Sequence, residues 1–144
     1  MKEITLKQAN EIINAAHREG QERKLAPLTI VVLDTGGHIR ALSRADGASF
    51  MRSKIAMAKA WGAIGMGLPS SALDEMGKQR PMFMNALIHI ADQGLMPVAG
   101  GVLVRDHNNT VIGSVGISGD LSDQDEHCAI VGIKAAGFST DSIK

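Results

Sequence analysis

Two strand-like runs, five glycines and an acidic helix start fall within one short segment of the chain, Pro97–Ala129. The runs cover Val98–Arg105 and Thr110–Ser118, and Asp, His, Asn and Asn separate them. Asn and Asp tolerate left-handed backbone angles and bond to their own backbone, which is typical of tight turns. The segment therefore predicts a β-hairpin whose second strand leads into a helix beginning near Ser122.

A second hairpin is expected earlier in the chain. Leu28–Leu33 is apolar at nearly every position and suits a strand covered on both faces, while His38–Arg44 returns after an Asp-Thr-Gly-Gly turn. Such short turns join antiparallel strands. Helices are expected over residues 5–23, 49–65, 72–77, 81–93 and 122–136. We expect an α+β fold, a mainly antiparallel sheet built from two hairpins with helices packed on it, in a single domain spanning residues 1–144.

Composition excludes several classes of function. Fifteen basic and fifteen acidic residues balance, no basic stripe is present, and aromatic residues are few, so nucleic-acid binding is not expected. Cys128 is the single cysteine, which rules out an intrachain disulfide. The sequence MKEITLKQANEI lacks an apolar signal core and no run of eighteen apolar residues occurs, so we expect a cytoplasmic protein without membrane attachment.

Glycines mark the second strand of the later hairpin. Gly113, Gly116 and Gly119 recur at every third position. Because glycine weakens a strand, the pattern indicates that something approaches this backbone closely. A dinucleotide site is excluded, since that fingerprint needs Gly-x-Gly-x-x-Gly within a strand–helix–strand unit and no strand follows the expected last helix. We expect the glycine edge and the acidic helix start to form a site.

The chain resembles the GlcG/HbpS-like family, which is related to the C-terminal domain of PduO-type proteins. The matching pieces are VVLDTGGHIRALSRADGA, the Lys59-Ala60 pair, PVAGGVLV, and VIGSVGISG followed by DQDE. The resemblance implies an HbpS-like fold, haem binding or degradation, and a homo-oligomer, expected as a tetramer or octamer. Some members of the family are instead linked with small-molecule catabolic enzymes. The resemblance also makes four glycines candidates for ligand binding: Gly100, Gly101, Gly116 and Gly119.

Arg44 and Asp46 flank the end of the second expected strand. An arginine there can hold a carboxylate or propionate through two parallel hydrogen bonds. Alternatively, the two side chains pair with each other and fix the turn.

Lys59 interrupts an apolar helical run, Ile55–Trp61. A partly buried lysine has a lowered pKa and can act as a base or as an amine nucleophile. The alternative is a lysine that extends along the helix edge to water.

Asp123, Asp125 and Glu126 lie in the first turn of the last expected helix, where the helix dipole alone favours acidic residues. We take Glu126 as the site candidate, because it matches the acidic pair of the family and follows the glycine edge. We therefore expect Arg44, Asp46, Lys59 and Glu126 to converge on one cleft.

Five histidines show no metal-site spacing, so a zinc site is not indicated. His17 lies at the edge of the apolar face of the first expected helix, and His89 lies within a Met-rich helix. Either imidazole could ligate haem iron from an apolar pocket, because axial ligation needs only one.

Two hypotheses of function follow. In the first, the protein binds haem or a related tetrapyrrole, with Arg44 or Lys59 pairing with a propionate. In the second, it is a cofactor-independent small-molecule enzyme. Its catalytic residues would be Lys59 and Glu126, which transfer protons, together with Asp46, while Arg44 binds a substrate carboxylate.

Overall fold

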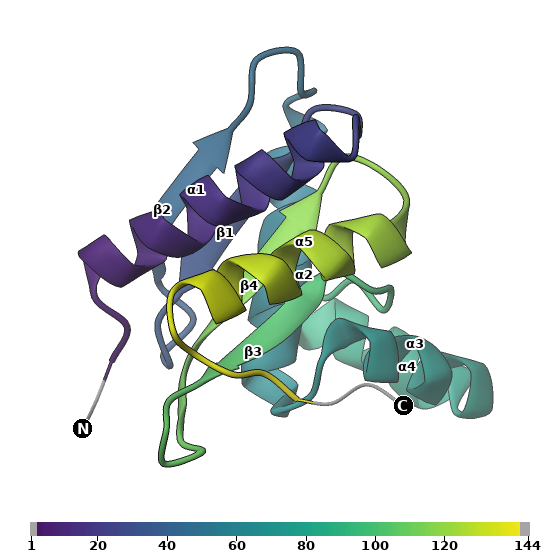
Figure 1. The fold of residues 1–144 in the computed structure, drawn as a ribbon. Helices are drawn as coiled ribbons and strands as arrows, with labels where there is room; N and C mark the ends of the chain where they lie inside the picture. The colour runs from purple at the N-terminus through teal and green to yellow at the C-terminus, as the bar shows by residue number, and fades with distance from the viewer. Residues whose placement is uncertain (1–2, 142–144) are drawn as a thin grey trace.

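The fold is that of a computed structural model, which describes residues 3–141; residues 1–2 and 142–144 of the expected domain lie outside that range. Five helices and four strands follow one another along the chain (Figure 1). They are α1 (Leu6–Glu22), β1 (Thr29–Leu33), β2 (Ile39–Arg44), α2 (Met51–Met66), α3 (Ser70–Gln79), α4 (Pro81–Ile90), β3 (Gly101–Arg105), β4 (Val111–Ser118) and α5 (Ser122–Ala135).

The four strands form one antiparallel sheet in the order β2-β1-β4-β3. Each hairpin supplies an outer and an inner strand, and the inner strands β1 and β4 pair with each other. Val31 on β1 stands opposite Leu42 on one side and Gly116 on the other. The predicted α+β fold with two hairpins is therefore confirmed.

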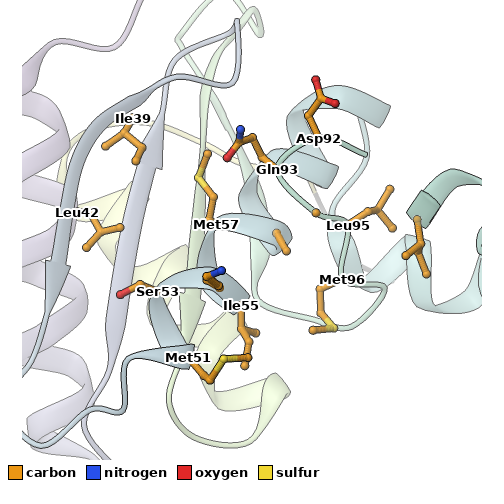
Figure 2. A pocket seen from close by; sticks show the side chains of 14 residues that line it. Ile39, Leu42, Met51, Ser53, Ile55, Met57, Asp92, Gln93, Leu95 and Met96 are labelled. Carbon is orange, nitrogen blue, oxygen red and sulfur yellow. The ribbon is translucent and has the colours of Figure 1, made fainter. Parts of the chain in front are cut away.

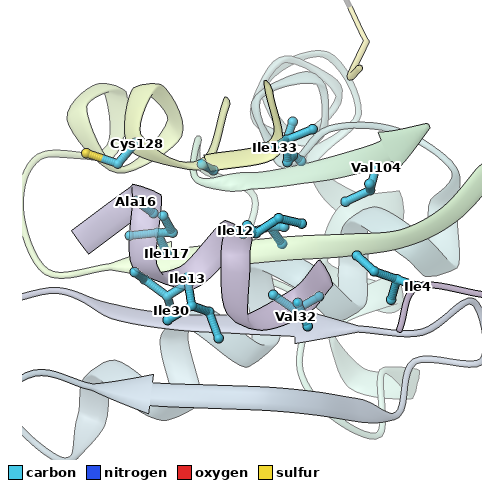
Figure 3. Close-up of a cluster of buried hydrophobic side chains, with 14 of the residues drawn as sticks. Ile4, Ile12, Ile13, Ala16, Ile30, Val32, Val104, Ile117, Cys128 and Ile133 are labelled. Atoms are coloured by element: carbon cyan, nitrogen blue, oxygen red, sulfur yellow. The ribbon is translucent and has the colours of Figure 1, made fainter. Parts of the chain in front are cut away.

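Helices α1 and α5 lie side by side across one face of the sheet (Figures 1 and 3). Thr5 and Gln8 close a reciprocal capping box at the start of α1, as the sequence Thr-Leu-Lys-Gln favours. The main core lies between these helices and the sheet. Its buried side chains include Ile12, Ile13 and Ala16 of α1, Ile30 and Val32 of β1, Val115 and Ile117 of β4, and Cys128, Ala129 and Ile133 of α5.

Helix α2 covers the opposite face and approaches the sheet backbone closely. Gly101 and Gly116 stand opposite each other in the ladder between β3 and β4. A Cβ at Gly116 would lie 2.1 Å from the Ala56 carbonyl oxygen, and one at Gly101 would lie 2.2 Å from the Lys59 carbonyl oxygen. The close approach that the glycines indicate is therefore that of a helix in the same chain.

Some expected boundaries differ from those of the structure. α3 begins at Ser70 rather than near residue 72, and the Ser70 hydroxyl accepts a hydrogen bond from Gly101 N (2.7 Å) instead of capping the helix. β3 begins at Gly101 rather than Val98. α4 ends at Ile90, before residue 93, because Ala91 is extended.

No helix within residues 3–141 is long and apolar enough to cross a bilayer.

Candidate functional site

Lys59 is buried against the C-terminal end of β4, with only 2% of its surface exposed. Its ammonium donates hydrogen bonds to the Ile117 carbonyl oxygen (2.9 Å) and to Asp125 Oδ2 (3.1 Å). α2 carries this side chain toward the N-terminus of α5, and Gly100 leaves room for it, since a Cβ there would lie 2.7 Å from Lys59 Nζ. The alternative of a lysine extending to water is therefore wrong.

The partner of Lys59 is Asp125, a residue that sequence reasoning assigned to the helix dipole. Asp125 is 1% exposed, and its second carboxylate oxygen accepts a hydrogen bond from Asp120 N (3.0 Å). Burial lowers the pKa of Lys59 and raises the pKa of Asp125, while their mutual attraction opposes both shifts. The bonds to both carboxylate oxygens make Asp125 the anchor between α2 and α5.

Glu126 lies beside this pair and is less tightly held. Burial raises its pKa, while the nearby Ser71 hydroxyl and Lys59 oppose that shift. Glu126 Oε2 and Ser71 Oγ are both buried without a well-formed hydrogen bond to any described residue. A carboxyl group in this condition can hold or release a proton, which is the property a general acid or base needs.

The raised pKa of Glu126 gives a stability prediction. The folded state favours the protonated form of Glu126, so protonation of this side chain stabilises the fold. This stabilisation is complete below the ordinary pKa of 4.5 and is lost as the pH rises through the raised pKa. The wild type loses this stabilisation between pH 4.5 and neutral pH, whereas Glu126→Gln has no carboxyl group to ionise. The free energy of unfolding of the variant, relative to that of the wild type, should therefore rise over this range by no more than about 1 kcal/mol, because the side chain is partly exposed.

Urea unfolding at both pH values measures the difference, with Glu22→Gln at an exposed position of α1 as the control. Equal pH dependence in the two variants would contradict the assignment of the raised pKa to Glu126.

The other expected site residues gather at a different place, where β2 ends. Asp46 lines a cavity of about 320 Å³ together with His17 and the segment from Leu25 to Leu28. Arg44 donates to the Ala48 carbonyl oxygen (2.8 Å) rather than to Asp46. The structure thus brings Lys59 close to Glu126 and Asp46 close to His17, as two separate groups.

His17 and His89, the two candidate iron ligands, have different environments. His17 is half-buried, burial lowers the pKa of its imidazole, and Nε2 lies 3.0 Å from Ser43 Oγ. His89 is exposed in the last turn of α4. Within residues 3–141, no group of three His, Cys, Asp or Glu side chains is placed to hold a metal ion.

The candidate ligand-binding glycines contact protein atoms. Gly101 and Gly116 face the backbone of α2, Gly100 faces Lys59, and a Cβ at Gly119 would lie 2.4 Å from the Pro27 carbonyl oxygen. Packing within the chain accounts for these four glycines, and a ligand contact through them stays a prediction.

A larger hollow, which we call the methionine cleft, lies between β2, α2 and the segment after α4 (Figure 2). Its volume is about 600 Å³, within the usual range of small-molecule sites. Sequence reasoning missed it, because its walls come from segments distant in the chain. The lining is mostly apolar and includes Ile39, Leu42, Met51, Met57, Leu95 and Met96.

Known proteins share this architecture. Residues 4–134 match the family described as "Haem degrading protein HbpS-like". The crystal structure of a PduOC:heme complex aligns with a TM-score of 0.86 at 23% identity, over 97% of this chain and 99% of that one, and this likeness shows the fold. Among curated proteins, no sequence matches the chain.

Two further solved structures are similar. Klebsiella pneumoniae protein ORFY gives a TM-score of 0.85 at 25% identity, over 95% of this chain and 92% of that one. HbpS gives a TM-score of 0.81 at 27% identity, over 93% and 90% of the two chains, and a double mutant of Streptomyces reticuli HbpS superposes equally well.

Proposed function

The chain belongs to the HbpS-like family of haem-degrading proteins, and from this premise we propose that it binds haem or a related tetrapyrrole, with His17 as the iron ligand. A relative with the same fold was crystallised as a heme complex, which supports this class of ligand.

The observation that carries the proposal is the environment of His17. A histidine ligates haem iron through the neutral imidazole, and burial lowers the pKa of His17, which favours the neutral ring. The ring lines a cavity whose neighbours include Leu25, Pro27 and Leu28. Its Nδ1 makes no hydrogen bond to a described residue, while the Ser43 contact orients the ring through Nε2.

The residues around His17 support contact with one edge of an iron porphyrin, since the cavity of about 320 Å³ is smaller than the whole group. The apolar side chains of the 25–28 segment would contact the ring edge, and Arg44 keeps guanidinium donors beyond its single bond to Ala48, so it could hold a propionate. Lys59 does not suit that role, because its ammonium is buried against Asp125. When bound, haem would supply a redox-active iron beside His17.

His17→Ala is expected to weaken hemin binding by at least about tenfold, because it removes the first ligand of the iron. Titration followed by the Soret band measures the affinity and reveals the loss of imidazole ligation. His89→Ala is the matched control, since His89 is exposed on α4. Unchanged Soret spectra and affinity in His17→Ala would overturn the ligand assignment, and no saturable binding to the wild type would overturn the function.

Proton-transfer chemistry remains the second candidate, favoured by the raised pKa of Glu126 and the unpartnered Oε2 atom.

The expected homo-oligomer also stays a proposal. Large apolar side chains exposed on this chain support it, among them Phe50, Met82, Ile90 and Leu121.

A further inference from the structure

The methionine cleft has a floor and two walls (Figure 2). One stripe of α2 forms the floor, with Met51, Ile55 and Ala58 spaced at helical intervals. The segment from Asp92 to Met96 forms one wall, and β2 forms the other.

An irregular register turns two apolar side chains of β2 toward the cleft. Leu42 pairs with Val31, and Ile39 pairs with Leu33, although three positions separate Ile39 from Leu42. Residues three apart on a regular strand point to opposite faces, and the shift in register places both on the α2 face. There they are 53% and 40% exposed, which is costly for apolar side chains without an occupant.

The charges at the rim of the cleft are separated. Lys54 of α2 and Asp92 beyond α4 form no ion pair with any described residue. Figure 2 places Asp92 at one end of the cleft and Met51 and Ile55 at the other. Lys54 lies within one helical turn of both Met51 and Ile55 in α2. The cleft therefore combines an apolar body with one cationic and one anionic end.

We propose that the methionine cleft binds a small monoacid with an apolar body, such as a medium-chain carboxylate. The carboxylate contacts Lys54, and the chain lies against Ile39, Leu42 and the methionine side chains. Flexible thioethers adapt to apolar ligands of differing shape, which suits a class of chains rather than one rigid compound. Asp92 repels a second acidic group at the far end, so monoacids are selected over diacids.

This site is independent of the proposed haem function, because His17, Arg44 and Asp46 do not line the cleft. The two proposals therefore fail or succeed on separate measurements.

Isothermal titration calorimetry with hexanoate, octanoate and decanoate tests the proposal. Affinity should rise with chain length, by up to roughly fourfold per methylene group, as apolar surface is buried. Decanedioate, which carries a second carboxylate, should bind more weakly than decanoate, and Asp92→Asn should reduce that difference. Lys54→Gln should weaken decanoate binding by about twofold to fivefold. Lys134→Gln, which removes an exposed charge on α5, should leave it unchanged.

Leu42→Asp checks the location of the site. Leu42 is part of the wall and partly exposed, so the variant should fold and lose decanoate binding. Circular dichroism verifies the fold of each variant. The absence of decanoate binding to the wild type, or binding that Leu42→Asp leaves intact, would overturn the proposal. Equal affinities for decanoate and decanol would overturn the role of Lys54.

Discussion

Gly116→Ala is expected to lower the free energy of unfolding by about 3 kcal/mol, although it adds a single methyl group. The added Cβ would lie 2.1 Å from the Ala56 carbonyl oxygen and 2.9 Å from the Ala60 backbone nitrogen. Both neighbours belong to the backbone of α2, which cannot change rotamer to make space. Relief therefore requires the helix to move away from β1, β3 and β4, with a loss of packing along its length.

Gly65→Ala is the matched control, because Gly65 lies in α2 itself and a Cβ there has no neighbour within 4 Å. Alanine is the better helix former, so this variant should gain up to about 1 kcal/mol. Urea unfolding, followed by the fluorescence of Trp61, measures both changes. If Gly116→Ala unfolds at the wild-type midpoint, α2 does not lie as close to β4 as the structure places it.

Local sequence patterns were sufficient for the hairpins and for α1. The Asp-Thr-Gly-Gly and Asp-His-Asn-Asn turns and the Thr5–Gln8 capping box act over a few residues, so they operate in the isolated chain as in the fold. Helix and strand boundaries that depend on contacts between distant residues could not be predicted from the sequence. The hydrogen bond between Ser70 and Gly101 joins residues 31 positions apart and determines how α3 meets β3.

The candidate site shows the same division. Lys59 was recognised as unusual from its alanine-rich surroundings, but the sequence could not decide between burial and extension to water. The adjacent residues Asp125 and Glu126 differ in direction by about 100° around α5, and no local signal says which one faces α2. Likewise His17 lies at the edge of an apolar helix face and His89 among apolar residues, and only the tertiary fold leaves His17 half-buried and His89 exposed.

Lys59→Met is expected to cost about 3–5 kcal/mol of stability, because it leaves Asp125 as a buried carboxylate without its cation. Methionine replaces the lysine stem and lacks only the terminal ammonium, so the loss arises mainly from the charge rather than from a large cavity. Lys54→Met is the control, because Lys54 of the same helix is exposed in the methionine cleft and pairs with no described acidic residue; it should change stability by no more than about 0.5 kcal/mol.

Adding Asp125→Asn to Lys59→Met should restore a substantial part of that loss. The amide has no charge to bury, and its oxygen can still accept the hydrogen bond from Asp120 N. A double-mutant cycle by urea unfolding gives the coupling energy, which should be about 1–3 kcal/mol for two residues in direct contact. Additive single and double variants would mean that Lys59 and Asp125 do not act as a pair. In that case α2 and α5 would be linked only through the sheet that lies between them.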